Sequence, residues 1–327
     1  MKKIIINKND ENNRLDKFIM KLLPLLPEKM MYKSIRKKRI KVNGKKSEIS
    51  YRLKEGDVLE LYINDEFFEK STTEDDFKSA PVNLDIVYED ENVMIINKKA
   101  GLIVHPDKNC KVDCLINRIK NYLFKKGEYN PENENSFAPA LVNRIDRNTQ
   151  GMVMAAKNAQ SLRELNKKIK SREIYKFYLT IVCGTIKKDE DTLTAFLDKN
   201  KDKNKVYIKN KNADLKKYKT IITKYKVLKR SRKFTLLEVS LLTGRTHQIR
   251  AHFASIGHPL LGDGKYGKNI INKELKYKYQ ALCAYKIHFD FKDSDGFLNY
   301  LNGKTFEINS ENIWFIEDFN TRILKSY

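Results

Sequence analysis

Residues 144–151 of this chain read Arg-Ile-Asp-Arg-Asn-Thr-Gln-Gly and place one carboxylate, Asp146, between two arginines. Apolar runs lie on either side, at 140–142 and 152–155, so the pattern predicts a strand, a polar turn and a second strand. A carboxylate held between cations stays ionised at neutral pH and can act as a nucleophile or base. The arginines suit a polyanionic substrate. By its local pattern alone, Asp146 is also compatible with an ordinary turn residue.

Two further predicted elements carry side chains that could take part in a reaction. A helix is predicted at 246–256, and on it His247 and Arg250 are three residues apart, so they share a face. A strand is predicted at 174–183 by its alternating pattern, and it presents the ring of Tyr178 on one side.

Three stretches, in order along the chain, resemble the motifs of the RluA-type pseudouridine synthases. Residues 144–151 resemble the central motif, usually written His-Arg-Leu-Asp, two variable residues, Thr-Ser-Gly. Residues 88–102 resemble the first motif, and 243–252 (Thr-Gly-Arg-Thr-His-Gln-Ile-Arg-Ala-His) resemble the third, which is long and specific. Two positions depart from the family pattern: Asn143 stands where the family usually has His, and Gln150 where it usually has Ser.

The resemblance implies an RNA isomerase that breaks the N1–C1′ bond of a uridine and rejoins the base through C5, with no cofactor and no metal. Asp146 would be the catalytic carboxylate, and both attack at C1′ and proton abstraction at C2′ remain open. The family pairs this Asp with the Arg of Gln-Ile-Arg, which selects Arg250 over Arg245 and predicts a bidentate ion pair. The family's Lys-x-Tyr element selects Tyr178 over Tyr175. The residues predicted to bind the substrate are Arg144, His247, Gln248 and Ile249.

A small basic module is predicted at residues 1–69. Helices at 14–23 and 29–38 precede a strand, an Asn-Gly turn and a strand at 39–46, and a closing strand follows within 53–63. The module resembles the alpha-L RNA-binding domain first known from a small-subunit ribosomal protein. A helix N-terminus beside a basic hairpin makes a phosphate-binding surface, although a solvated basic face is the alternative. The residues predicted to bind RNA are Arg14, Lys33, Arg36, Lys37, Lys38, Arg39, Lys41, Lys45 and Lys46.

A polar stretch at 70–81 is the predicted linker to a catalytic domain at 82–327. The pattern of this domain predicts an α+β fold, with a mixed, mainly antiparallel central sheet and a catalytic cleft. Its segment 187–217, rich in Lys, Asn and Asp, is predicted to be exposed and either RNA-facing or mobile. The predicted strands are 85–89, 93–97, 140–145, 152–156, 174–183, 218–229, 234–242 and 282–291. The predicted helices are 112–125, 158–170 and 246–256.

The composition agrees with a nucleic-acid partner. The chain has 65 Lys and Arg against 42 Asp and Glu, a formal net charge of +23, which favours binding to a polyanion. A proteome-wide bias toward Lys would raise the charge as well. The four cysteines form no Cys-x-x-Cys pair, so free thiols in a reducing cytosol fit better than a zinc site. No apolar stretch approaches the ~20 residues of a membrane span, and we expect a cytoplasmic protein that binds no membrane.

The resemblance, together with the charge, implies an RNA pseudouridine synthase that modifies 23S ribosomal RNA, and we expect a monomer. The run at 31–44 is closest to the RluC subgroup of the family, whereas the same reaction on transfer RNA is the near alternative. A non-catalytic RNA-binding or ribosome-assembly protein is a second alternative, and the intact set of Asp146, Tyr178 and Arg250 argues against it. A metal-dependent nuclease would need a cluster of acidic ligands, and no Asp/Glu group has such spacing.

Overall fold

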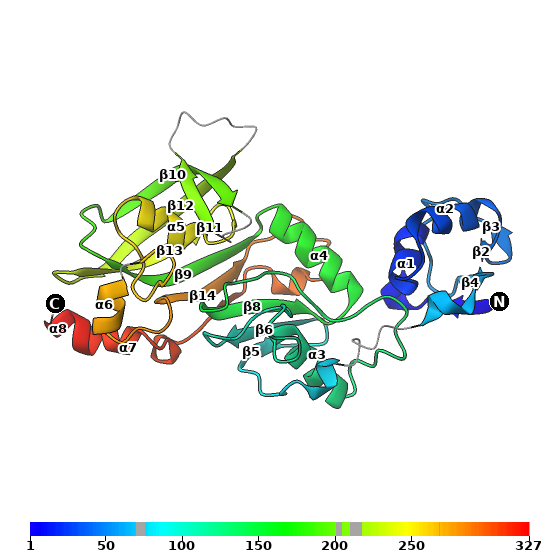
Figure 1. The fold of residues 1–327 in the computed structure, drawn as a ribbon, viewed down its shortest axis with the longest axis horizontal. Helices are drawn as coiled ribbons and strands as arrows, with labels where there is room; N and C mark the ends of the chain where they lie inside the picture. Colours follow the sequence, from blue (N-terminus) through cyan, green and yellow to red (C-terminus); the bar gives the residue numbers. More distant parts are fainter. Residues whose placement is uncertain (70–75, 201–204, 210–217, 268, 327) are drawn as a thin grey trace.

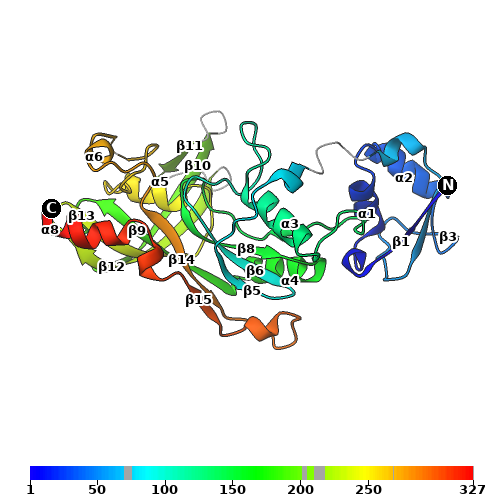
Figure 2. The same cartoon turned by 90° about the horizontal axis from the view of Figure 1, so that it is seen from below.

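The computed structural model describes residues 1–326 except 70–75, 201–204, 210–217 and 268. The molecule is elongated, with a small N-terminal domain at one end and a larger domain built on a long sheet (Figure 1). The small domain lies beyond the end of α3 and α4 in both Figure 1 and Figure 2. This arrangement confirms the predicted α+β fold, in which a small α+β domain precedes the larger domain in the sequence.

The N-terminal domain packs two helices, α1 (Leu15–Leu22) and α2 (Glu28–Arg36), on a four-stranded antiparallel sheet of order β1-β4-β2-β3. Asn43 and Gly44 make the predicted tight turn, with φ of 52° and 74°, values that suit Asn-Gly. Strand β1 was not predicted, because its side chains are mostly exposed and carry no alternating pattern. The strands are β1 (Lys2–Ile5), β2 (Ile40–Val42), β3 (Lys45–Lys46) and β4 (Val58–Leu61).

Eleven strands form the sheet of the larger domain, in the order β11-β10-β12-β13-β9-β14-β8-β6-β5, with β7 beside β8 and β15 beside β14. In the described ladders every pair is antiparallel except β14 with β8, so the mixed, mainly antiparallel sheet is confirmed. The strands are β5 (Ile86–Glu89), β6 (Val93–Lys98), β7 (Ala140–Leu141), β8 (Gln150–Ala156), β9 (Ile174–Cys183), β10 (Glu190–Asn200), β11 (Lys205–Lys209), β12 (Lys219–Arg230), β13 (Phe234–Leu241), β14 (Leu282–Phe289) and β15 (Thr305–Glu307).

Helices cover both faces of this sheet. Successive residues of β8 alternate between the faces: Met154 packs in a core cluster with Leu165 of α4, and Val153 packs in another with Ile119 of α3 and Phe253 of α5. The central strand is therefore buried on both sides, and α5 is fixed close to the loop that precedes β8. The helices are α3 (Leu115–Lys125), α4 (Ala159–Lys170), α5 (Gln248–Ser255), α6 (Asn269–Glu274), α7 (Ile316–Asp318) and α8 (Leu324–Ser326).

The segment before Asp146 is less regular than predicted. Of the strand expected at 140–145, only β7 (Ala140–Leu141) forms. The side chain of Asn143 accepts a hydrogen bond from the Met154 N–H at 2.8 Å and donates one to the Met152 carbonyl at 3.4 Å. These side-chain bonds replace the backbone ladder, and the chain is free to form the turn that carries Asp146.

Within the predicted exposed segment 187–217, the structure contains strands β10 and β11, and residues 201–204 and 210–217 lie outside the described part. Leu197 and Val206 are buried in a small cluster with Ile221 and with Ala251 of α5. The prediction missed both strands because Lys, Asn and Asp interrupt the apolar alternation that identifies a strand. The hairpin therefore packs against α5.

The predicted linker lies partly outside the described residues, at 70–75. In the described part of the predicted linker, Phe77 is buried against the rings of Phe124 and Tyr129, with centroids 6.0 and 5.9 Å away. The side chain of Asn121 donates to the Ala80 carbonyl at 2.6 Å. Residues 76–80 are thus part of the larger domain's packing, and the domain limits stay a prediction.

Polar contacts join the two domains. Asp10, which is buried, accepts hydrogen bonds from Asn135 at 2.7 Å and from Ser136 at 2.6 Å. Asn9 accepts one from the backbone N–H of Ala159, the first residue of α4, at 3.0 Å. A buried carboxylate needs such donors, and here the larger domain supplies them.

Candidate active site

A buried lysine holds the loop that carries Asp146. Lys98, at the end of β6, directs its Nζ at the carbonyls of Lys99, Leu102 and Arg147, at distances of 2.8–2.9 Å. Burial disfavours the charge of Lys98 and lowers its pKa to about 7. The three carbonyl acceptors favour the charged form, because they match the three N–H donors of an ammonium group. The first motif and the Asp146 turn are thereby tied to each other.

Two residues of the central motif are explained by contacts with β14 and with the residue Gln280 just before it. Gly151 has φ of 127° and pairs with Ala284 in the parallel ladder, and a Cβ at Gly151 would lie 2.4 Å from the backbone N and O of Ala284. Only glycine allows this approach. The Thr149 hydroxyl accepts a buried hydrogen bond from Gln280 at 3.0 Å, and the Thr149 N–H closes the turn on the Asp146 carbonyl at 3.1 Å.

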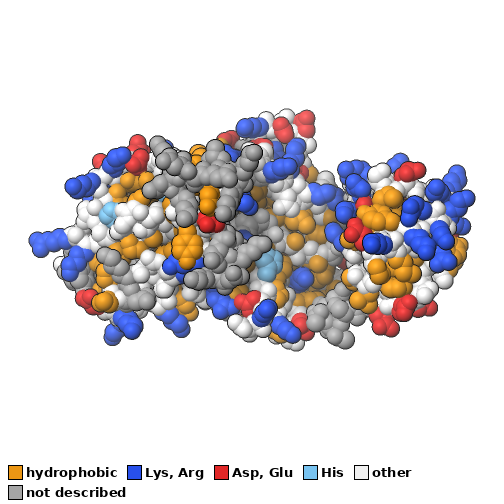
Figure 3. Space-filling view, turned by 45° about the horizontal axis from the view of Figure 1, so that its top comes forward, with side chains coloured by type: hydrophobic (Ala, Val, Ile, Leu, Met, Phe, Trp, Pro, Cys, Tyr) orange, Lys and Arg blue, Asp and Glu red, His pale blue; other side chains and the backbone are white. Residues whose placement is uncertain are grey.

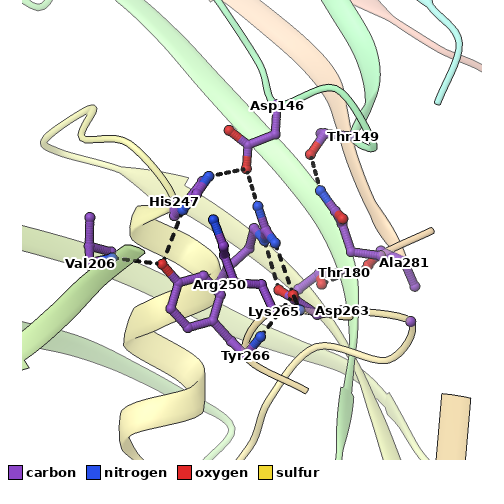
Figure 4. A network of polar contacts seen from close by, with 12 residues as sticks. Asp146, Thr149, Thr180, Val206, His247, Arg250, Asp263, Lys265, Tyr266 and Ala281 are labelled. Carbon is purple, nitrogen blue, oxygen red and sulfur yellow. Dashed lines mark hydrogen bonds and ion pairs between the residues drawn. The ribbon is translucent and has the colours of Figure 1, made fainter. Parts of the chain in front are cut away.

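Arg250 joins two carboxylates (Figure 4). Its Nη1 donates to Asp146 Oδ2 at 2.7 Å, while its Nε and Nη2 donate to Asp263 Oδ2 and Oδ1 at 2.7 and 2.9 Å. The predicted pairing with Asp146 is present, but the bidentate pair is made with Asp263. Burial opposes the charge of Arg250, yet Asp263 and Asp146 together raise its pKa above the usual range. The guanidinium is therefore a fixed cation.

Asp263 is fully buried and orients Arg250. Besides the guanidinium, its Oδ1 accepts the backbone N–H groups of Lys265 at 2.8 Å and Tyr266 at 3.1 Å. Burial alone would raise the pKa of the Asp263 carboxyl, but Arg250 and these N–H donors outweigh burial and lower the pKa. An ionised Asp263 fixes two of the guanidinium nitrogens and leaves Nη1 to face Asp146.

His247 approaches the same oxygen of Asp146. It precedes α5 in the left-handed region, with φ of 55°; its Nε2 lies 3.8 Å from Asp146 Oδ2 and its Nδ1 3.0 Å from the Tyr266 hydroxyl. Burial lowers the pKa of His247, and Arg250 lowers it further while Asp146 opposes both. Since Arg250 and His247 both face Oδ2, Asp146 Oδ1 receives no hydrogen bond from the described residues and is free to meet a substrate.

A pocket opens beside Asp146 between β9, β13, β14 and α5. Tyr178, Leu241 and Leu282 contribute to its wall. Tyr178 is 7% exposed, and burial, with the nearby Asp146 charge, raises its pKa above the usual range, so the phenol stays protonated. Tyr175 is 46% exposed and lies against the His288 ring. The structure thus places Tyr178, not Tyr175, beside the carboxylate.

The predicted substrate-binding residues occupy different parts of this pocket. Ile249 is buried in its lining, whereas Arg144 and Arg245 line it with exposed side chains. A planar, fixed cation such as arginine is suited to phosphate. Arg144, Ile249 and His247 all line the pocket with Asp146, and their contact with the substrate stays a prediction.

Gln248 is fully engaged with the protein. Its Nε2 donates to the Ile222 carbonyl and the Thr223 hydroxyl, both at 3.0 Å. Its Oε1 accepts the Thr243 hydroxyl at 2.9 Å and the Arg245 N–H at 3.1 Å. With no hydrogen-bonding capacity left over, the amide fastens the turn before α5 to β12. Its predicted substrate contact stays a prediction.

Gln150, one of the two departures from the family pattern, connects the motif to the C-terminal segment. Its Nε2 donates to the Asn312 carbonyl at 2.7 Å, and its Oε1 accepts the Trp314 N–H at 3.4 Å. A serine side chain is too short to make both contacts. Gln150 thus bonds to the backbone of the C-terminal segment and Asn143 to the backbone of β8, and neither bonds to the carboxylate.

Comparison with known proteins identifies the family. Residues 92–255, half of the chain, match the family described as RNA pseudouridylate synthase, and residues 13–59 match the S4 domain. The chain belongs to the RNA pseudouridine synthase family. Its predicted enzyme class and its predicted ribosomal-protein-type RNA-binding domain are both confirmed.

Relatives of this synthase cover nearly its whole length. An uncharacterized RNA pseudouridine synthase of Mycoplasma capricolum subsp. capricolum is 36% identical over 93% of this chain and 96% of that protein. Ribosomal large subunit pseudouridine synthase C of Buchnera aphidicola subsp. Schizaphis graminum is 33% identical over 84% and 83%. The solved structure of human RNA Pseudouridylate Synthase Domain Containing 1 has a TM-score of 0.52 at 22% identity, over 68% of this chain and 82% of that one. It supports the fold.

Most of the predicted RNA-binding residues of the synthase lie on the surface of its S4 domain, where Lys and Arg side chains gather (Figure 3). Lys41 is half-buried, with its Nζ 5.2 Å from the centre of the Tyr62 ring, and Arg14 is paired with Asp16 through bonds of 3.0 and 3.1 Å. The others are exposed and form no ion pair with any described carboxylate: Lys33, Arg36, Lys37, Lys38, Arg39, Lys45 and Lys46.

The sequence reasoning missed three residues of this site: Lys98, Asp263 and Tyr266. All three lie within or just after the stretches that resemble the family motifs, so their position was a usable signal. Their partners, however, are distant in sequence, and no local pattern shows which of them are close to Asp146.

The described part of the synthase contains neither a metal-binding cluster nor a membrane-spanning helix. No group of three or more His, Cys, Asp or Glu side chains in it lies close enough together to hold a metal ion. None of its helices has the length and apolar character needed to cross a membrane.

Proposed function

We propose that the synthase uses Asp146 as the catalytic carboxylate that isomerises a uridine to pseudouridine. The observation that carries this proposal is the contact of Asp146 Oδ2 with Arg250 at 2.7 Å, which leaves Oδ1 free beside the Tyr178 pocket. A fixed guanidinium orients the carboxylate and costs no reorganisation during the reaction. Both nucleophilic attack at C1′ and proton abstraction at C2′ are compatible with this geometry.

The pocket residues take complementary parts in the reaction. The target base must leave its stack, at a cost of a few kcal/mol, and Tyr178 and Ile249 offer it an aromatic and an aliphatic surface. Because the phenol stays protonated, Tyr178 acts through stacking and hydrogen-bond donation, and its hydroxyl is not a ready base for the C5 proton. Arg144, exposed at the pocket, can bind phosphate or fill the space that the base vacates.

We propose large-subunit ribosomal RNA as the substrate. The name of the Buchnera relative and the exposed cations of the S4 domain support this choice. Phosphate contacts supply affinity without sequence information, so the basic surface is equally compatible with transfer RNA. We also propose that the synthase works in the cytoplasm as a monomer and needs no cofactor.

The test is a map of pseudouridines in ribosomal and transfer RNA from cells that express wild-type protein, Asp146→Asn or Asp107→Asn. Asp107 is a matched control, because it also pairs with an arginine of the loop, Arg147, at 2.8 Å, but lies outside the pocket. Asp146→Asn should lose particular pseudouridines in large-subunit RNA, and Asp107→Asn should keep them.

Other results would change the proposal in definite ways. Loss confined to transfer RNA would keep the chemistry and overturn the substrate. Unchanged pseudouridines with Asp146→Asn, at equal expression and equal RNA binding, would overturn the role of Asp146.

A further inference from the structure

Tyr266 connects the active site to a strand that is remote from it in sequence. Its hydroxyl accepts the backbone N–H of Val206, in β11, at 2.9 Å, and lies 3.0 Å from His247 Nδ1 (Figure 4). Since the oxygen already accepts the Val206 N–H, the hydroxyl proton is available for His247 Nδ1. The bond to β11 thus leaves the hydroxyl free to donate to the histidine.

That direction sets the tautomer of His247. When Nδ1 accepts a hydrogen bond from the Tyr266 hydroxyl, the ring proton of the neutral imidazole resides on Nε2, which faces Asp146 Oδ2 at 3.8 Å. The charged groups that act on the ring are Asp146, Arg250, Lys265 and Asp263. With Nε2–H and Arg250 on the same side, Oδ2 is the occupied oxygen of Asp146 and Oδ1 the reactive one.

The backbone conformation of His247 explains why its side chain needs the contact with Tyr266. A non-glycine residue with φ of 55° is strained, so its side chain is held only if neighbours specify its position. The Tyr266 ring supplies two such contacts: it lies edge-on to the His247 ring, with centroids 5.7 Å apart at 75°, and its centre lies 5.3 Å from Arg250 Cζ. Tyr266 thus touches both residues that face Oδ2.

We propose that Tyr266 is a positioning residue of the synthase, which holds His247 as the Nε2–H tautomer and anchors this arrangement to strand β11. The inference rests on the proposed role of Asp146. Val206 is 2% exposed, in a cluster with Leu197 and with Ala251 of α5. A shift of the β10–β11 hairpin is therefore transmitted to Tyr266, and the orientation of Asp146 depends on how the hairpin is seated.

The test is the pH dependence of single-turnover pseudouridine formation by full-length Tyr266→Phe. We expect the rate at pH 7 to fall about tenfold, since orientation of catalytic groups contributes strongly to rate, while the affinity for RNA stays within about twofold of wild type. Without the hydroxyl donor, the neutral imidazole loses a stabilising bond and the pKa of His247 rises. The acid limb of the rate profile should move to higher pH.

A second variant separates positioning from simple destabilisation. His247→Asn keeps a residue type that tolerates the left-handed region and removes the titrating ring. In the His247→Asn background, Tyr266→Phe should have no further effect on the rate and should not move the acid limb. Additive losses in the double variant would overturn the proposal.

The matched control is Tyr277→Phe, which removes a hydroxyl from a buried tyrosine outside the site, bonded to Asp318 at 2.6 Å. It should lose stability but keep the wild-type rate profile. If Tyr266→Phe matches Tyr277→Phe in rate and pH profile, Tyr266 has only a structural role and the inference is wrong. If Tyr266→Phe does not fold, His247→Asn alone decides, because a wild-type rate for it overturns the inference.

The same series distinguishes this inference from the function on which it rests. An active Asp146→Asn enzyme would refute the role of the carboxylate, whatever Tyr266→Phe does. An inactive Asp146→Asn enzyme together with a wild-type Tyr266→Phe enzyme would refute only the positioning role.

Discussion

Replacing Arg250 by leucine tests whether one cation serves both carboxylates of the site. The change removes the single bond to Asp146 and both bonds to Asp263, which is fully buried. Removing one partner of a buried ion pair costs about 3–5 kcal/mol. Asp263 keeps the backbone N–H groups of Lys265 and Tyr266, so we expect the lower end, about 3 kcal/mol.

The loss should appear in both stability and activity. Each kcal/mol shifts the melting temperature of a domain of this size by about 2–4 °C, so Arg250→Leu should melt about 6–12 °C lower. Turnover should fall at least about a hundredfold, the usual effect of removing one preorganised donor. Calorimetry measures the first quantity, and single-turnover pseudouridine formation below the melting temperature measures the second.

The double variant Arg250→Leu with Asp263→Asn separates the two effects. A neutral buried amide is less costly than a stranded charge, so the pair should regain about 1–2 kcal/mol of stability without regaining turnover. The control is Arg118→Leu, whose partner Asp113 is 48% exposed; it should cost at most about 1 kcal/mol. Wild-type stability and turnover in Arg250→Leu would refute the reasoning, and would indicate that Arg250 does not orient Asp146.

Three further changes test other parts of the structure. Tyr178→Phe should slow turnover about tenfold or more, because the protonated phenol donates a hydrogen bond, and wild-type enzyme assayed up to pH 10 should show no loss of rate from tyrosine ionisation. Lys37→Gln and Lys45→Gln should each weaken RNA binding and reduce the slope of log affinity against log salt by up to about 1. The reason is that a protein with one cation fewer displaces fewer counterions from the RNA when it binds. The buried partner Lys168 lowers the pKa of Glu173 to about 2. The ionised carboxylate should therefore stabilise the fold at pH values above its ordinary pKa of about 4.5, and this contribution should be lost as the pH falls toward 2. Glu173→Gln should flatten the pH dependence of the free energy of unfolding in that interval.

Each of these predictions has an outcome that contradicts it. A Tyr178→Phe enzyme with wild-type turnover would leave the hydroxyl without a function. A salt slope that changes as much in the control Lys21→Gln, an exposed lysine of α1 outside the predicted surface, would mean that the S4 surface has no specific phosphate contacts. If urea unfolding of wild type and Glu173→Gln has the same pH dependence between pH 5 and 3, the Lys168 pair does not control acid stability.

Local features of the sequence determined the domain types and most of the elements. The Asn43-Gly44 turn, the apolar face of α1 and the alternation of β9 depend on residues a few positions apart, where backbone preference and periodicity decide the structure. The same holds for the central motif, in which a polar turn between two apolar runs shows where Asp146 lies. These features place Asp146, Tyr178 and Arg250 on a turn, a strand and a helix, but they do not show which of the three side chains meet.

The tertiary structure decided which side chains meet. Lys98 reaches the Arg147 carbonyl across two motifs, and Tyr266 reaches the Val206 N–H through a strand that its Lys- and Asn-rich sequence concealed. Arg250 gives its bidentate face to Asp263 instead of Asp146, because only Asp263 lies fully buried behind the guanidinium. Such choices depend on how β14 packs on β8 and how α5 packs on the sheet, and these are long-range contacts that periodicity and turn chemistry do not encode.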